Sequence, residues 1–300
     1  MLSNFNDLKE KLAKSSKKTI AVAAAQDFHT LEAVFDAAKE FGVDYIFTGV
    51  KKEILAVCAE LGQTIDEEKI IETENDEEAA KIAVSLIREK HADILMKGKL
   101  QTATLLKAVL NKETGIRSGS AMSHMAVLEC PNHDRLLFMS DGGMIPYPDL
   151  EQKRAILENG VNFMHSLGYD KPNVAVLAAV ESVNEKMPET LHAAELAKLN
   201  TDGEIANCIV EGPLSFDLAI SQESAAIKGI ESRVSGNTDM LLMPNIATGN
   251  IMSKALLYLG GAKMAGCILG AKVPIVLVSR GASAEEKRLS ILLCLCSKNK

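Results

Sequence analysis

The chain of 300 residues alternates short apolar, β-rich runs with longer helical patterns along nearly its whole length. Such alternation is typical of parallel sheets whose connecting helices cover both faces. About nine strands with about nine helices are too many for one small sheet, so the pattern predicts two α/β domains. We expect domain I to comprise residues 1–140 with a returning C-terminal helix, 284–300, and domain II to comprise residues 141–283.

The elements behind this expectation are short and evenly spread. The predicted strands are 19–24, 45–48, 69–72, 94–97, 135–139, 173–178, 208–211, 239–243 and 274–278. The predicted helices are 31–41, 53–61, 77–89, 102–110, 150–167, 188–199, 217–227, 250–258 and 284–296.

Composition narrows the class of protein. With 47% hydrophobic and 24% charged residues, the chain is able to bury a substantial core. A net charge of −7 argues against nucleic acid or an anionic membrane as the main partner. No apolar run is long enough to span a bilayer, and the first 18 residues lack the apolar segment of a targeting peptide. The six cysteines show no zinc-ligand spacing, so we expect reduced thiols. With no targeting peptide and no membrane span, we expect a cytoplasmic location.

Small, flexible or charged residues follow four of the predicted strands at the point where each strand ends. The four segments are Lys97–Lys99, Asp141–Gly143, Pro244–Asn250 and Ser279–Gly281. Because the carboxyl ends of parallel strands meet at one edge of a sheet, where ligands gather, we expect these loops to form one site.

The cations of these loops suit an anionic ligand such as phosphate. Arg280 carries a planar fork that can make two parallel hydrogen bonds to phosphate oxygens. Lys97 and Lys99 stand just before Thr102, where a helix N-terminus adds its own preference for negative charge. Arg117, in the loop 115–120, is a second arginine able to clamp a phosphate with Arg280. For each of these residues the alternative interpretation is a solvated surface charge.

Glu286 has two competing interpretations. Ser283-Ala-Glu-Glu286 fits a helix capping box, in which the glutamate reaches back to the amide of the capping serine. The same carboxylate, a few residues after Ser279 and Arg280, is also a candidate base. The sequence leaves both interpretations open.

Six short motifs follow one another along the chain: 97–102 (KGKLQT), 140–143 (SDGG), 201–204 (TDGE), 234–239 (VSGNTD), 248–251 (TGNI) with Lys254, and 278–282 (VSRGA). Together these motifs resemble the phosphate acetyl/butyryl transferase family, which exchanges the acyl group of an acyl-CoA with inorganic phosphate. Further details, Gly115–Gly119 before Ser123-His124 and Glu211–Ser215 with Asp217, are similar to the butyryl branch of the family.

The resemblance implies an architecture and a set of substrates. It implies two α/β domains of the isocitrate/isopropylmalate dehydrogenase type, with the active site in a cleft between them. It also implies a homodimer or higher homo-oligomer that uses CoA and phosphate as substrates and needs no cofactor or catalytic metal.

The resemblance also implies roles for individual residues. Ser279 and Arg280 match a pair that stabilises charge at the reacting centre, and Glu286 falls where the acetyl branch has an aspartate base. Arg117 lies approximately where that branch has a phosphate-binding arginine. A further arginine of the family has no counterpart near Leu257-Tyr258. We therefore expect Lys97 or Lys99 to make some of the contacts with phosphate or CoA.

The expected substrate-binding set is therefore wider than the arginines. It comprises Lys97, Lys99, Thr102, Arg117, Asp141, Asn250 and Lys254.

These features predict a phosphate acyltransferase that converts butyryl-CoA and phosphate to butyryl phosphate and CoA. In the reverse direction, CoA thiolate attacks the acyl phosphate directly in a ternary complex. The alternatives are a preference for acetyl groups, or a protein that binds CoA or acyl phosphates without turnover. An NAD-dependent decarboxylating dehydrogenase is a third alternative, although the clustered metal-binding aspartates of that class are not evident.

Overall fold

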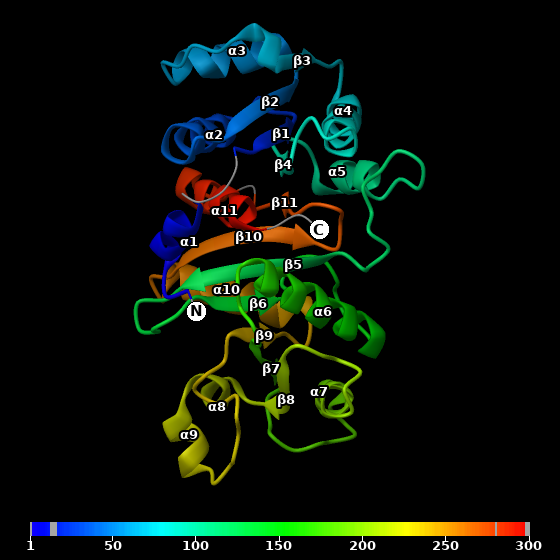
Figure 1. Ribbon diagram of the computed structural model, residues 1–300, viewed down its shortest axis with the longest axis vertical. Coiled ribbons are helices and arrows are strands. Elements are labelled where there is room, and N and C mark those ends of the chain that lie inside the picture. Colours follow the sequence, from blue (N-terminus) through cyan, green and yellow to red (C-terminus); the bar gives the residue numbers. More distant parts are fainter. Residues whose placement is uncertain (1, 13–16, 280, 298–300) are drawn as a thin grey trace. The chain divides into compact units, whose positions relative to one another are not determined.

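The computed structural model describes residues 2–12, 17–279 and 281–297, which form two compact units (Figure 1). The N-terminal unit comprises Phe5–Ser120 with Ala265–Lys300, and the central unit comprises Met1–Asn4 with Ala121–Met264. These divisions differ from the predicted domains 1–140 with 284–300 and 141–283. Strand pairing explains the difference, because residues 137–140 pair with a strand of the central unit and residues 275–276 pair with one of the N-terminal unit.

The strands of the N-terminal unit are mostly parallel. Strand β1 pairs in parallel with β2 and β4, β2 with β3, and β4 with β11, whereas β10 runs antiparallel to β11. Their order is β3 (Ile70–Glu72), β2 (Asp44–Gly49), β1 (Thr19–Ala23), β4 (Ile94–Lys97), β11 (Ile275–Val276) and β10 (Lys263–Leu269).

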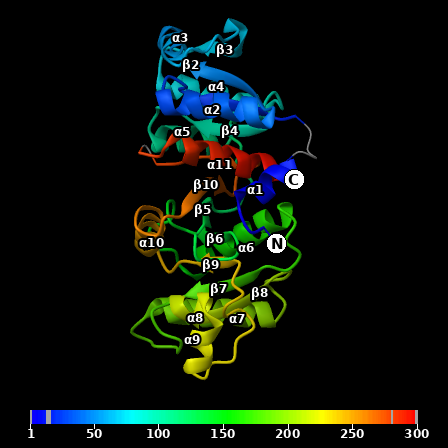
Figure 2. The ribbon, with the colours of Figure 1, turned by 90° about the vertical axis from the view of Figure 1, so that its left-hand side faces the viewer.

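Helices cover both faces of this sheet. In Figures 1 and 2, α2 and α11 lie side by side on one face, and α4 packs with α5 on the other. Asp27, at the amino end of α2, accepts a hydrogen bond from the amide of Thr30, and Gly42 ends the helix in the left-handed conformation. The helices are α1 (Phe5–Leu12), α2 (Phe28–Phe41), α3 (Lys51–Glu60), α4 (Asp76–Arg88), α5 (Thr102–Val109) and α11 (Ala284–Cys296), with a 3₁₀ turn at Glu67–Lys69.

The central unit repeats the same plan with different connections. Strands β6, β9, β7 and β8 are parallel neighbours in that order, and β5 pairs antiparallel with β6. The strands are β5 (Ser123–Glu129), β6 (Leu137–Ser140), β7 (Asn173–Leu177), β8 (Ile209–Leu214) and β9 (Met240–Leu242). The helices are α6 (Leu150–Ser166), α7 (Pro188–Thr201), α8 (Phe216–Ile220), α9 (Gln222–Ile227) and α10 (Ile246–Tyr258).

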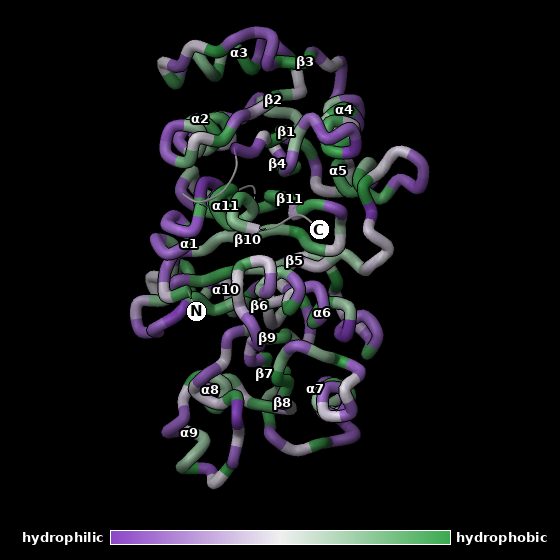
Figure 3. Tube along the Cα trace, viewed as in Figure 1, coloured by the Kyte–Doolittle hydropathy of each residue, from purple (hydrophilic) through white to green (hydrophobic). Residues whose placement is uncertain are grey.

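Alternation along these strands supplies two apolar faces, and Figure 3 shows the apolar residues concentrated on the strands. On one face, Met139 and Leu241 join a cluster with α8 and with Leu256 of α10. On the other face, Met240 packs against α6 so closely that a Cβ on Gly160 would lie 2.6 Å from its Sδ. The core of this unit therefore sits on both sides of one sheet.

The predicted fold class, α/β with largely parallel strands, is confirmed. Two strands were not predicted, β5 and β10. The predicted helix 217–227 is two helices that meet at Ser221. Within the described ranges, no helix combines the length and apolarity needed to cross a membrane.

Candidate functional site

Two of the four predicted loops follow neighbouring strands of the N-terminal unit. Because β4 and β11 are parallel, Lys97, the last residue of β4, and Ser279, which follows β11, lie toward the same ends of their strands. Ser279 is exposed, and Arg280 lies outside the described residues. The other two loops follow β6 and β9, which are parallel neighbours in the central unit.

Lys97 is buried, and its ammonium group hydrogen-bonds within its own loop. Its Nζ donates to the carbonyl oxygens of Gly98, at 3.0 Å, and Leu100, at 3.1 Å. The amide of Gly98 donates to the carbonyl of Ala23, and a Cβ on Gly98 would lie 2.1 Å from the carbonyl oxygen of Ala24. Only glycine therefore fits at position 98, and Lys97 fixes the shape of the loop.

The other predicted contacts of this unit are more exposed. The side chain of Lys99 is 62% exposed and lies 3.8 Å from the carboxylate of Glu53. Thr102 is the first residue of α5. Arg117 is exposed and forms a backbone bridge with Ala271, beside the turn that precedes β11, whereas Ser279 follows that strand. A joint clamp of Arg117 with Arg280 stays a prediction.

Glu286 lies at the start of α11 and is 9% exposed. The hydroxyl of Ser283 accepts a hydrogen bond from the amide of Glu286 at 3.1 Å, which is the serine half of the predicted capping box. The next residue, Lys287, is also buried and donates from Nζ to Oδ2 of Asp27 at 2.9 Å and to Oγ1 of Thr30 at 3.2 Å. This pair ties the first turn of α11 to the first turn of α2, and sequence reasoning missed it because 260 residues separate its members.

Asp141 organises the loop after β6. Its Oδ1 accepts hydrogen bonds from the amides of Gly143, at 2.7 Å, and Met144, at 2.9 Å, and its Oδ2 accepts from Ile145 at 3.1 Å. The residue is only 2% exposed. Its carboxylate thus holds three consecutive backbone amides.

The loop also packs against the amino end of α10. Asn250 donates from Nδ2 to the carbonyl of Gly142 at 3.2 Å. A Cβ on Gly249 would lie 2.7 Å from the carbonyl oxygen of Asp141, so the helix and the loop touch through backbone. Lys254, one turn further along α10, is exposed. Of the predicted contacts in this unit, Asp141 and Asn250 are therefore engaged with backbone and Lys254 faces outward.

The ring of His124 lies beside this loop. A Cβ on Gly143 would lie 3.0 Å from Cγ of the His124 ring. The Nδ1 atom of the ring is buried without a hydrogen-bond partner among the described residues. Burial lowers the pKa of His124, and the nearby charge of Asp141 only partly opposes this effect. The sequence alone did not predict this position, because a single histidine after a serine is compatible with many environments. The fold places His124 beside the loop that follows β6.

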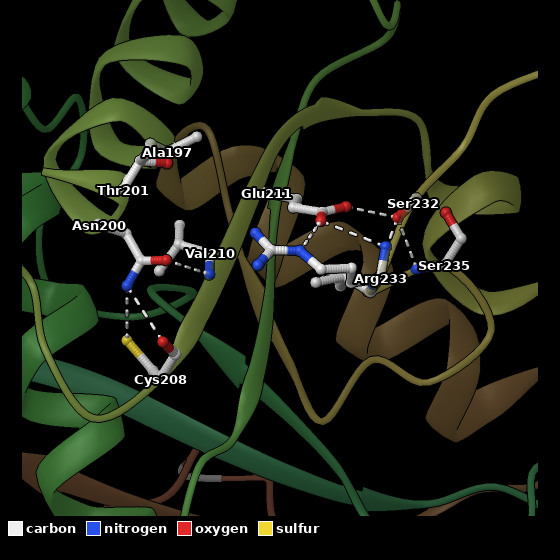
Figure 4. Close-up of polar contacts among 10 residues, drawn as sticks. Ala197, Asn200, Thr201, Cys208, Val210, Glu211, Ser232, Arg233 and Ser235 are labelled. Atoms are coloured by element: carbon white, nitrogen blue, oxygen red, sulfur yellow. Dashed lines mark hydrogen bonds and ion pairs between the residues drawn. The ribbon is translucent and has the colours of Figure 1, made fainter. Parts of the chain in front are cut away.

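The Glu211–Ser215 motif lies on β8, the edge strand of the central unit. Figure 4 shows Ser232 and Arg233 turned toward Glu211, which accepts hydrogen bonds from the Ser232 hydroxyl and from Nε of Arg233 at 3.0 Å. A cavity of about 320 Å³ lies here between β8, the end of α7 and residues 230–233. Glu211 thus holds residues 232–233 against β8.

Sequence comparison agrees with these motifs. The model of the phosphate acetyl/butaryl transferase family matches residues 77–294. The chain belongs to this family. A phosphate butyryltransferase from Clostridium acetobutylicum is 44% identical over 98% of the chain and 97% of the relative. A phosphate acetyltransferase from Thermotoga maritima is 43% identical over 94% and 96% of the two chains.

Solved structures show the same relationship. A branched-chain phosphotransacylase from Enterococcus faecalis V583 superposes with a TM-score of 0.81 at 32% identity, covering 93% of this chain and 98% of that one. A 4-hydroxythreonine-4-phosphate dehydrogenase from Klebsiella pneumoniae shares the fold alone, with a TM-score of 0.59 at 13% identity, covering 94% of this chain and 100% of that one. The resemblance read from the motifs is confirmed, as is the likeness of the fold to a dehydrogenase.

Proposed function

We propose that the chain transfers a short acyl group between CoA and inorganic phosphate, with butyryl as its preferred group. The observation that carries this proposal is the 44% identity to a phosphate butyryltransferase along nearly the entire length of both chains. The similar identity to a phosphate acetyltransferase makes acetyl the second candidate for the acyl group. CoA and phosphate are substrates in this reaction, which needs no resident cofactor.

In the proposed mechanism, the sulfur of CoA attacks the carbonyl carbon of butyryl phosphate as its proton leaves. A carbon–sulfur bond forms, the carbon–oxygen bond to phosphate breaks, and phosphate leaves. Arg280, with Arg117, balances the charge of the phosphate, and Ser279 donates a hydrogen bond to the developing oxyanion. Alignment of two bound substrates supplies much of the rate without a covalent intermediate.

Glu286 is the proposed acceptor of the thiol proton. Its burial at the start of α11 supports the proposal, because the loop 279–283 directly precedes that helix. An ordinary thiol and an ordinary carboxyl group differ by about 4 pKa units, so complete proton transfer is uphill by roughly 5–6 kcal/mol. We therefore propose that the proton moves as the carbon–sulfur bond forms.

The test is phosphate-dependent release of CoA thiol from acetyl-, butyryl- and isobutyryl-CoA. We expect the fastest release at four carbons, and Arg280→Ala to abolish most of it. Arg88→Ala, an exposed arginine of the same unit, serves as the matched control. A maximum at acetyl-CoA would keep the reaction and change the preferred group, and no release from any acyl-CoA would refute the proposal.

We also propose that the enzyme works in the cytoplasm as a homodimer or larger homo-oligomer, with small molecules as its partners. Family membership supports this proposal. Light scattering coupled to gel filtration measures the oligomeric state directly, and a monomer at assay concentration would contradict it.

A further inference from the structure

The outer side of α10 in the central unit, a helix that Figure 2 shows nearly end-on, is apolar although it is exposed. Lys254 is the only charged residue in Ile246–Tyr258. The inner side is apolar as well, because Met252 and Leu256 pack against the core of the unit. A helix that is apolar on every side is normally covered on every side, so this face is expected to have a partner. Three large apolar residues on it are mostly exposed: Ile251 at 68%, Tyr258 at 73% and Leu259, directly after the helix, at 90%.

Four exposed apolar residues form one row along α10, which we call the α10 row. They recur at intervals of four residues, so they lie one above the other on the same face of the helix. Large and small side chains alternate along the row, and rows of this spacing interdigitate when two helices pack. The residues of the α10 row are Ala247, Ile251, Ala255 and Leu259.

Two copies of the α10 row are complementary to each other. A two-fold axis midway between Ile251 and Ala255 turns the second helix antiparallel to the first. Ile251 then lies opposite the partner's Ala255, and Leu259 lies opposite the partner's Ala247, so each large side chain meets a small one. Two-fold dimers are the commonest assemblies of soluble proteins, and they pair the same patch on both subunits. The shape of the row therefore favours a second copy of this chain as its partner.

The area of this face also fits a contact between two copies. Full coverage of a leucine or isoleucine side chain removes roughly 100 Å² from water, and coverage of an aromatic one removes about 150–250 Å². At their exposed fractions, Ile251, Tyr258 and Leu259 together offer about 300 Å² in each copy, or about 600 Å² in two. Specific interfaces begin at about 1,200 Å² in total, so three side chains supply about half of that area. Further exposed residues adjoin them and extend the patch: Ala247, Ala255, Gly260, Gly261 and Pro131.

We propose that α10 of a second copy of this chain covers the α10 row across a two-fold axis, and that this pairing holds the loop after β6 in place. The inference deepens the proposed homo-oligomer, because it assigns the surface through which two copies associate. The link to the loop is short. A Cβ on Gly249 would lie 2.7 Å from the carbonyl oxygen of Asp141, and Asn250 donates to the carbonyl of Gly142 at 3.2 Å. A helix that the partner fixes from outside therefore fixes the Asp141 loop from inside.

The experiment measures molar mass by light scattering coupled to gel filtration. The double variant Ile251→Glu, Leu259→Glu places two charges in the α10 row, and Ile227→Glu, at an isoleucine of α9 that is 80% exposed, is the matched control. We expect the wild type and the control at twice the mass of one chain or an even multiple of it, and the double variant at half that mass with an unchanged circular dichroism spectrum. Ala255→Gln fills the gap opposite the partner's Ile251 without adding charge, and it should raise the dissociation constant by about tenfold or more.

A monomeric wild type, a double variant that keeps the full mass, or an Ala255→Gln protein that associates as tightly as the wild type would overturn the assignment. The same loss of mass in Ile227→Glu would overturn it too, because the effect would not belong to α10. The folded, dissociated double variant should release CoA thiol about tenfold more slowly or worse at saturating substrate, and an unchanged rate would overturn the link to the Asp141 loop. Mass does not depend on turnover. If the masses follow the expected pattern while the wild type releases no thiol from any acyl-CoA, the proposed function fails and the surface assignment stands.

Discussion

The ion pair between the buried Lys287 and the half-buried Asp27 predicts an unequal loss of stability when each partner is replaced. Lys287 has a side chain that is 7% exposed, whereas the side chain of Asp27 is 32% exposed. Asp27→Asn keeps a capping side chain on α2 but leaves the ammonium group buried opposite a neutral amide. Lys287→Met leaves a carboxylate that still accepts the amide of Thr30 at 2.9 Å and reaches solvent.

The magnitudes follow from this difference in burial. An uncompensated buried charge costs about 3–5 kcal/mol, which is our expectation for Asp27→Asn. Loss of one hydrogen bond to a charged group costs about 1.5–3 kcal/mol, which we expect for Lys287→Met. The double variant buries no charge, so it should be more stable than Asp27→Asn alone, with a coupling of at least about 1 kcal/mol.

Urea unfolding followed by circular dichroism measures these differences, with equal slopes required before free energies are compared. The reasoning is refuted if Lys287→Met is the more damaging change, or if the double variant costs the sum of the single ones. Because Lys287 adjoins Glu286, we also expect kcat to fall in Lys287→Met even where the protein is fully folded.

Three further predictions concern the same edges of the sheets. Glu286→Gln should lower kcat by about 100-fold or more in the thiol-release assay, with an unchanged melting temperature because the cap by Ser283 uses the backbone; near-normal kcat would leave it a capping residue only. Gly249→Ala should cost about 1–3 kcal/mol in urea unfolding and reduce activity, since its Cβ would press on the carbonyl of Asp141, and an unchanged protein would contradict the packing. Burial raises the pKa of Asp27, but hydrogen bonds from Thr30 and Lys287 outweigh this effect and lower the pKa below 3.8. The carboxylate is therefore charged at neutral pH, where the wild type should be more stable than Asp27→Asn. This difference in stability should disappear only as the pH falls below about 4 and Asp27 is protonated.

Local patterns predicted those elements whose signals lie within a few neighbouring residues. Helix α11 begins and ends where its pattern predicts, behind the capping Ser283. Strands β5 and β10, with the sequences SHMAVLE and KMAGCIL, contain few β-branched residues, and each has an antiparallel partner. Their extended conformation therefore depends on neighbouring strands and on burial, which no short window of sequence contains.

The sequence predicted which loops form the candidate site, but it did not predict which hydrogen bonds the side chains of those loops make. Asp141 was expected to bind substrate, and its carboxylate is occupied by the amides of Gly143, Met144 and Ile145. Aspartate followed by glycines is compatible with both roles, because the same side chain accepts hydrogen bonds from ligands and from nearby backbone. Only the folded loop shows which hydrogen-bond donors lie within reach of the Asp141 carboxylate, and these donors decide between the two roles.

Burial divides the predicted binding residues into two groups with different consequences. Lys97 and Asp141 are buried and bond to backbone of their own loops, so replacing either would change the shape of a loop. Lys99, Arg117 and Lys254 are exposed, so their charges attract an anionic substrate without supporting the fold. These exposed cations lie on different elements, because Lys99 follows β4, Arg117 precedes β5 and Lys254 lies in α10. This arrangement suits a reaction in which two highly charged substrates must bind and leave in every cycle, because exposed charges speed association and hold ligands only moderately.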